Sequence, residues 1–357
     1  MDAIYTELTS SDVMGVKPMR FISTTDLMDP NWDFLAPYSE NPNLIWETHS
    51  GQPRNMLERG LTRPHIGRWR AALSAARSAR SSLQTSLLVS HLPYMGGVTN
   101  VLRRQLCPEV PQIAFAFNFT DLPSGRRLAK LRKAYQGIEE FVVFSRYEIG
   151  VYSDLFDIPS ERFSFLPWAM DTPVPGPENP VGFKAPYLCS IGGEGRDYAL
   201  LARAMRALPH INMAIVARPY SIAGVDFPSN VEVFTNLSLP KTWALAASSE
   251  GMVIPLKTDK TACGHITLVG AQKLGVPLVV TRSVGVEDYV SNGISAGDLA
   301  QLKRTIEALY SGDPEIISTA KVSQSQAVEH NSPQVWLQYF KRLAERFEKL
   351  VQPEKGA

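Results

Sequence analysis

The stretch from Ala262 to Gly293 reads ACGHITLVGAQKLGVPLVVTRSVGVEDYVSNG, and it predicts one half of a parallel α/β repeat. Apolar residues at helical spacing indicate a helix over residues 266–274. Gly275 ends this helix, because glycine suits the cap and the proline two residues later cannot continue it. The short apolar run 278–281 then predicts a strand that is buried on both faces of a parallel sheet.

The start of this helix, at Gly264 and His265, is a candidate phosphate site. The backbone N–H groups of a first helical turn can bind an anion, and ligands of parallel sheets lie at the carboxyl ends of the strands. A lone histidine is more often a surface or core residue than a catalyst, but a cationic His265 would stabilise a leaving diphosphate. Thr267 would cap the helix or donate to phosphate. Lys257 and Lys260 either add to the positive field or face solvent.

The same stretch resembles the donor domain of GT-B fold glycosyltransferases, in the large bacterial polysaccharide and glycolipid group called group 1 or family 4-like. The chain keeps these positions of the group's motifs: Leu268, Ala271, Gly275, Pro277, Val279, Val280, Gly285, Asp288, Val290 and Gly293. Two acids of the group are missing, since Ala262 and Gly270 stand at their positions. The resemblance implies that the second acid holds the donor ribose, so this contact is absent or made otherwise. It also places Asp288 near the donor sugar, although a helix cap or turn residue fits the pattern too.

Length and composition predict a two-domain cytoplasmic protein. A chain of 357 residues exceeds one typical domain, and 44% hydrophobic residues can form two cores. No run of about 18 apolar residues occurs, and the first residues lack the pattern of a secretory signal. The three cysteines are widely spaced, which favours buried thiols in a reducing compartment over disulfides or a zinc site.

Apolar runs that predict strands alternate with segments of helical periodicity, which indicates an α/β architecture with parallel sheets. Together with the resemblance, this implies a GT-B fold: two Rossmann-like domains facing each other across a cleft, with a C-terminal helix that crosses back to the first domain. The expected strands are residues 20–23, 43–47, 86–90, 112–117, 141–144, 187–191, 213–217, 231–234, 252–256 and 278–281. The expected helices are residues 67–82, 98–106, 126–135, 198–207, 241–247, 266–274 and 333–351. The segment 145–171 resembles an element of the same group in which a helix is followed by the last strand before the hinge.

A proline-rich segment predicts the boundary between the domains. Residues 171–186 contain five prolines and little apolar content, as in an extended linker. We expect an acceptor-binding domain over residues 1–170, this hinge, a donor-binding domain over 187–332 and a crossing helix and tail over 333–357. The apolar face of the crossing helix comprises Trp336, Tyr339, Phe340, Leu343, Phe347 and Leu350.

A glycine-rich turn opens the expected donor domain. Gly192 and Gly193 follow a predicted strand and precede a predicted helix, and such turns alone are a weak signal. Glycines let the backbone approach a ligand closely, and Arg196 could donate two hydrogen bonds to a phosphate. In the resembling enzymes a Lys or Arg at this place contacts the donor diphosphate, and Arg196 matches it.

Two strand ends of the expected acceptor domain carry candidate catalytic residues. His91 directly follows one predicted strand, and Asp121 follows the next. Enzymes of the resembling group often have a histidine at the position of Asn118, which leaves Asp121 and His91 as candidates. An inverting transfer needs such a base to deprotonate the acceptor hydroxyl, whereas a retaining transfer does not.

Basic residues gather in two segments, residues 54–80 and 126–133, although the net charge is only +1. Within the first segment Ile66, Trp69, Leu73 and Ala76 share one helical face. This pattern fits a helix on an anionic membrane or against an acidic acceptor, and equally a helix packed on a sheet with a solvated basic face. Nucleic acid is disfavoured, because no binding motif accompanies the charges.

These observations favour a hexosyltransferase-type glycosyltransferase that needs no metal and uses a nucleotide-sugar donor, a UDP-sugar before a GDP-sugar. The expected acceptor is a lipid-linked sugar or polysaccharide of bacterial surface-glycan synthesis, reached from the cytoplasm or the inner membrane surface. Two alternatives remain: a relative that binds nucleotide or sugar without transfer, and a nucleotide-sugar epimerase, which needs further carboxylates. An NAD-dependent oxidoreductase is disfavoured by the glycine spacing of residues 192–195.

Overall fold

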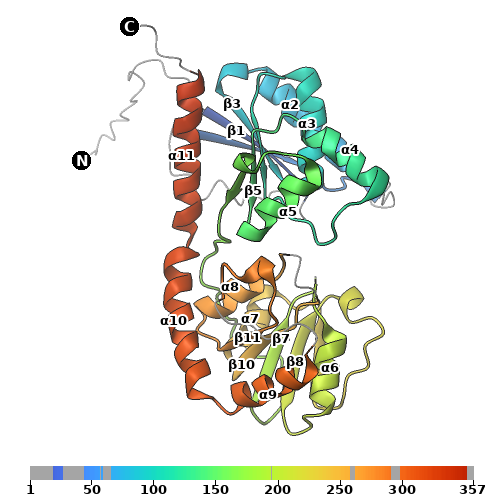
Figure 1. Ribbon diagram of the computed structural model, residues 1–357, viewed down its shortest axis with the longest axis vertical. Helices are drawn as coiled ribbons and strands as arrows, with labels where there is room; N and C mark the ends of the chain where they lie inside the picture. The colour runs from blue at the N-terminus through green and yellow to red at the C-terminus, as the bar shows by residue number, and fades with distance from the viewer. Residues whose placement is uncertain are drawn as a thin grey trace, which may run out of the picture.

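The computed structural model describes residues 19–26, 44–56, 58, 66–193, 195–257, 262–290 and 298–351, the last four of these by backbone only. Lys260, Gly293, the basic residues Arg59 and Arg63, the side chain of Leu350 and the N-terminal segment lie outside this description. The chain forms two α/β lobes along its longest axis, and the last two labelled helices run along one side of both (Figure 1).

The first lobe contains a six-stranded parallel sheet in the order β2-β1-β3-β4-β5-β6. Its strands are β1 (Met19–Thr25), β2 (Leu44–Ser50), β3 (Ser86–His91), β4 (Gln112–Phe115), β5 (Glu140–Val143) and β6 (Phe163–Phe165). Its helices are α2 (Ile66–Arg80), α3 (Pro93–Leu106), α4 (Gly125–Tyr135) and α5 (Arg146–Phe156). Helix α2 packs on the sheet through its small residues, with Ala75, Ala76 and Ala79 buried against Ile22 and Leu88.

The second lobe contains a five-stranded parallel sheet in the order β11-β10-β7-β8-β9. Its strands are β7 (Tyr187–Ile191), β8 (Asn212–Ala217), β9 (Val231–Thr235), β10 (Gly251–Ile254) and β11 (Leu278–Val280). Its helices are α6 (Tyr198–Arg206), α7 (Leu239–Ala247), α8 (His265–Lys273) and α9 (Leu299–Tyr310). Helices α7 and α8 cover one face, and α6 and α9 the other, which buries every strand of the sheet centre. Strand order reverses between β7 and β10, where ligands of such sheets bind.

The C-terminal helices join the two lobes. Helix α10 (Pro314–His330) lies beside the second lobe, and α11 (Pro333–Val351) lies along the first (Figure 1). The predicted apolar face of α11 is buried in the core of the first sheet, where Trp336 and Phe340 contact Phe115 edge-on or tilted. The two parallel sheets and the crossing helix are confirmed.

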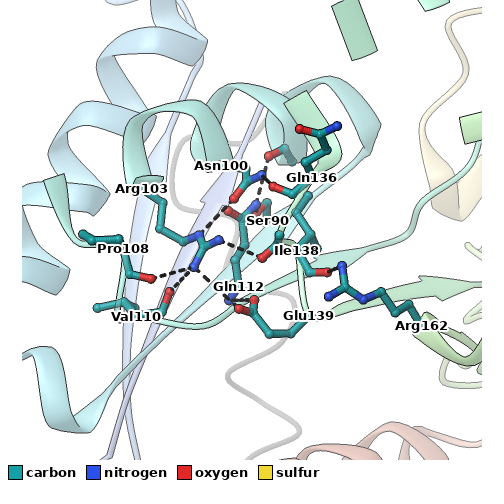
Figure 2. Close-up of polar contacts among 12 residues, drawn as sticks. Ser90, Asn100, Arg103, Pro108, Val110, Gln112, Gln136, Ile138, Glu139 and Arg162 are labelled. Carbon is teal, nitrogen blue, oxygen red and sulfur yellow. Dashed lines mark hydrogen bonds and ion pairs between the residues drawn. The ribbon is translucent and has the colours of Figure 1, made fainter. Parts of the chain in front are cut away.

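A buried arginine supports the first sheet at the amino ends of β4 and β5 (Figure 2). Arg103 of α3 is 4% exposed and donates to the carbonyl oxygens of Val110 and Gly137, each at 2.7 Å, and to Asn100 Oδ1 at 2.9 Å. Beside it Gln112 donates to the Gly96 carbonyl at 2.9 Å. The network ties the last turns of α3 to the segments before β4 and β5, and Gln112 ties β4 to the first turn of α3.

The structure differs from the sequence-based elements in several places. Helix α3 begins at Pro93, five residues before its predicted start, because Gly96 and Gly97 are helical and let α3 approach Ala114 and Tyr135 closely. Strand β4 ends two residues early, since Ala116 has a positive φ of 54°. Helices α9 and α10 were not predicted. Among the described helices, none is long and apolar enough to span a bilayer.

Candidate functional site

Arg196 lies at the reversal of strand order in the second sheet. The loop after β7 brings it beside the end of β10, where it forms an isolated bridge with Leu256. Its side chain is buried, with the residue 3% exposed, and Nε and Nη2 lie 3.3 and 3.2 Å from the Ile191 carbonyl. Nη2 also donates to Thr267 Oγ1 at 3.4 Å. A permanently charged group is therefore held next to the first turn of α8.

Two glycines make room for this guanidinium. Gly192 has φ +129°, and a Cβ there would lie 2.5 Å from Arg196 Nη2. Gly264 has φ +94°, and a Cβ there would lie 3.0 Å from Nη1. Both positions need glycine for the positive φ and for the close approach. The structure thus brings together four predicted donor-binding residues: Gly192, Arg196, Gly264 and Thr267.

The start of α8 offers backbone N–H groups to an anion. Its N-cap is Gly264, which has no side chain to cap the first turn. The turn itself holds no acidic residue, and the positive end of the helix dipole favours an anion there. With Arg196 alongside, the arrangement can bind a diphosphate through backbone N–H groups and a guanidinium.

His265 is buried rather than exposed to a ligand, at 6% exposure. Its Nε2 lies 2.9 Å from the Gly285 carbonyl, and its ring lies 4.7 Å from that of Tyr289. Burial lowers the pKa of His265 to about 4, against the opposing effects of the Gly285 contact and Asp288. The imidazole is therefore neutral at pH 7 in this structure, which differs from the cationic group expected from the sequence, because the sequence does not reveal burial.

The remaining donor-side candidates lie around this centre. Gly193 adjoins Arg218 and Tyr220, since a Cβ there would lie 2.6 Å from Arg218 Cγ and 3.2 Å from the Tyr220 hydroxyl. Both residues follow β8 and are exposed. The sequence did not predict them as site residues, because no glycine motif marks them. Lys257 is exposed, and its backbone N–H donates to the Gly195 carbonyl at 2.8 Å.

Asp288 pairs with the first lobe. Its Oδ2 accepts the backbone N–H of Arg146 at 2.8 Å, and its Oδ1 lies 2.5 Å from Arg146 Nη1. It follows the short helix η5 (Val284–Val286) and caps the start of α5, which belongs to the other domain. The structure therefore places Asp288 at an interdomain helix cap, in line with the helix-cap alternative. Its position near the donor sugar, which the resemblance implies, stays a prediction.

The first-lobe candidates lie in different surroundings. His91 at the end of β3 is 4% exposed and stacks near Phe115, with ring centroids 6.3 Å apart. Burial lowers its pKa to about 3, so it is a neutral core residue at pH 7. Asp121 is exposed on the loop between β4 and α4.

Asn118 and Glu148 form a hydrogen-bonded pair that the sequence did not predict. Asn118 Nδ2 donates to Glu148 Oε1 at 2.8 Å and, across the domains, to the Ala262 carbonyl at 2.7 Å. Glu148 is 2% exposed and accepts the Tyr152 hydroxyl at 2.7 Å. Burial raises the pKa of Glu148 to about 7, although the hydrogen bonds from Tyr152 and Asn118 lower it. The sequence did not predict these contacts, because Asn118 is 30 residues from Glu148 and 144 residues from Ala262.

The positions of the two missing acids are filled by packing. Ala262 is 2% exposed. A Cβ at Gly270 would overlap the ring of Trp243, which leaves no room for a carboxylate there. Within the described ranges, no group of three or more His, Cys, Asp or Glu side chains is arranged to hold a metal ion.

This architecture defines a class: the chain has the GT-B fold. The Anabaena protein HepE, solved with UDP-glucose, superposes with a TM-score of 0.71 at 12% identity over 92% of this chain and 100% of its own. A Burkholderia multivorans α,α-trehalose 6-phosphate synthase gives 0.68 at 10% identity over 96% and 99%. The lipopolysaccharide outer core galactosyltransferase WaaB gives 0.62 at 10% identity over 92% and 100%. No family model and no curated protein sequence matches the chain.

Proposed function

We propose that the protein is a glycosyltransferase whose nucleotide-sugar donor binds with its diphosphate between the loop after β7 and the start of α8. The observation that carries this proposal is the buried Arg196 guanidinium, seated between Gly192 and Gly264 and hydrogen-bonded to Thr267. A buried cation beside an uncapped helix start suits a multiply charged anion better than a neutral ligand.

This site suits the chemistry of glycosyl transfer. When the bond between the sugar and the diphosphate breaks, negative charge develops on the leaving phosphate. Arg196 and the backbone N–H groups of α8 are already in place to stabilise that charge. His265 contributes as a neutral side chain that ties the start of α8 to Gly285.

The donor that we favour is a UDP-sugar, before a GDP-sugar. HepE, which shares the fold, has been solved with UDP-glucose and with UDP and glucose. Next to the phosphate site, exposed Tyr220 and Arg218 flank Gly193 and can contact the nucleoside. We also propose that the transferred sugar is a hexose, because the ligand solved with HepE is UDP-glucose.

For the acceptor we propose an anionic, lipid-linked sugar or polysaccharide of bacterial surface-glycan synthesis, reached at the inner membrane surface. The guanidinium groups of Arg68 and Arg127 lie 5.2 and 5.1 Å from the ring centroid of Tyr94, near the carboxyl end of β3. Helix α4 exposes further basic residues, namely Arg126, Lys130, Arg132 and Lys133. On α2, Ile66 and Trp69 are 47% and 43% exposed. In an inverting reaction, Asp121 would be the base.

The alternative of a nucleotide-binding relative without transfer has one structural observation in its favour. The positions of both missing acids are buried or packed, and Asn118 contacts Ala262 directly. Turnover with an acceptor distinguishes the two functions, because both predict nucleotide binding.

The proposed phosphate site is tested by calorimetry with UDP, GDP and UDP-glucose on wild type and Arg196→Ala. A charge-assisted hydrogen bond contributes about 1.5–3 kcal/mol, so the variant should bind UDP about 10- to 100-fold more weakly. Arg203→Ala, an exposed arginine on α6, is the matched control and should bind as wild type does. Equal UDP affinity of folded Arg196→Ala and wild type would remove Arg196 from the site.

A further inference from the structure

Polar contacts between the two domains involve two segments beside the start of α8: the turn 262–264 and residues 288–289. Asn118 reaches the Ala262 carbonyl, two residues before the Gly264 cap. The Tyr289 hydroxyl donates to the Phe144 carbonyl at 2.6 Å and accepts the Trp168 N–H at 2.8 Å. The Asp288 cap on α5 lies next to Tyr289 in the chain.

These segments also contact each other. His265, the first residue of α8, contacts the Gly285 carbonyl and the ring of Tyr289. The start of α8 is therefore held from its own domain through His265 and from the other domain through Ala262. A displacement of the turn 262–264 would move both Gly264 and the surface on which Arg196 rests.

Asn118 is itself held in one orientation. Its amide nitrogen has two hydrogens, and it donates to two acceptors, Glu148 Oε1 and the Ala262 carbonyl. Tyr152 donates to the same Glu148 oxygen, and the Phe119 N–H donates to the Tyr152 hydroxyl at 2.9 Å. The first domain thus presents a fixed donor to the turn of the second.

We propose that Asn118 is a positioning residue for the donor phosphate site: through the Ala262 carbonyl it holds the turn 262–264 so that Gly264, the first turn of α8 and Arg196 are preorganised for a diphosphate. This proposal rests on the proposed function for the identity of the ligand, but the interdomain contact itself does not. It makes donor affinity depend on a residue of the opposite domain that need not touch the donor.

The test compares Asn118→Ala and Asn118→Asp with wild type by hydrogen–deuterium exchange of the ligand-free protein and by UDP calorimetry. Loss of one net hydrogen bond should speed exchange in residues 262–268 and weaken UDP binding, each by about 2- to 10-fold. Asn118→Asp should be worse than Asn118→Ala, because it places an acceptor oxygen against the Ala262 carbonyl and Glu148. A merely space-filling role predicts the reverse order, since aspartate has the shape of asparagine.

Asn179→Ala is the matched control, because the Asn179 amide donates to the Tyr187 hydroxyl at 2.9 Å in the linker region. It should leave exchange in residues 262–268 and UDP affinity unchanged. Exchange in β3 and β8, one strand from each sheet, reports whether each variant is folded. Wild-type exchange of residues 262–268 in Asn118→Ala, or a milder effect of Asn118→Asp, would overturn the proposal. Wild type that fails to bind UDP would refute the proposed donor, while the exchange arm would still decide the role of Asn118.

Discussion

Replacing Glu148 by Gln should change how stability depends on pH. Burial raises the pKa of Glu148 from 4.5 to about 7, so the folded protein holds this proton more tightly than the unfolded chain. The stabilisation from the bound proton is complete below pH 4.5 and is lost as the pH rises through 7. The glutamine side chain of the variant would stay neutral, and its carbonyl oxygen can accept the same two hydrogen bonds from Asn118 and Tyr152.

The size of the effect follows from the pKa. At about 1.4 kcal/mol for each tenfold change in proton affinity, a rise from 4.5 to about 7 corresponds to about 3 kcal/mol. Most of this difference develops between about pH 5 and pH 8.5. We therefore expect Glu148→Gln to gain about 2–3 kcal/mol relative to wild type over that interval.

The assay is urea unfolding of both proteins at several pH values, followed by tryptophan fluorescence. The buried histidines His91 and His265 titrate in both proteins, so their contributions cancel in the difference. Glu161→Gln, an exposed glutamate of the same domain, should show no such trend. A stability difference for Glu148→Gln that stays constant within about 0.5 kcal/mol from about pH 5 to 8.5 would refute the argument from burial.

Three further outcomes are expected. Asp121→Asn should keep UDP affinity within a few-fold and lower turnover by roughly a hundredfold, and near-normal turnover would indicate a retaining mechanism or another base. The protein should cosediment with anionic liposomes in low salt, through the basic residues of α4 and the exposed Trp69, and should be released in high salt. Equal binding to neutral vesicles would indicate that these residues are only a solvated helix surface. Gly270→Ala should lower the free energy of unfolding by about 1–3 kcal/mol, because its Cβ would overlap the ring of Trp243; an unchanged melting temperature would contradict this packing.

The grouping of the candidate donor-site residues was largely predictable from the sequence because its signals are local. Helix α8 begins and ends within one residue of the predicted bounds, since Gly264, Gly275 and the following proline set its limits. Arg196 follows a glycine turn after a strand, and parallel topology places every such turn at the same edge of the sheet. Adjacent local signals therefore converged on Gly192, Arg196, Gly264 and Thr267.

The properties that depend on burial were not predictable in this way. His91 and His265 read as titratable groups in the sequence, but both are buried, which lowers their pKa values to about 3 and about 4. No sequence motif marks Glu148, which is a single acid on α5, and burial raises its pKa to about 7. Desolvation depends on what surrounds a side chain in three dimensions, and the surrounding residues come from distant parts of the chain.

The sequence by itself determined the two parallel sheets, the amphipathic C-terminal helix and the loops that hold Arg196, because periodicity, caps and turns act over a few residues. Only the tertiary structure decided what joins the domains. Asn118 and Ala262 are 144 residues apart, and Arg146 and Asp288 are 142 apart. No local pattern pairs such residues, since their contact depends on how two separately folded sheets are oriented by the linker and by the packing of α11 against the first core.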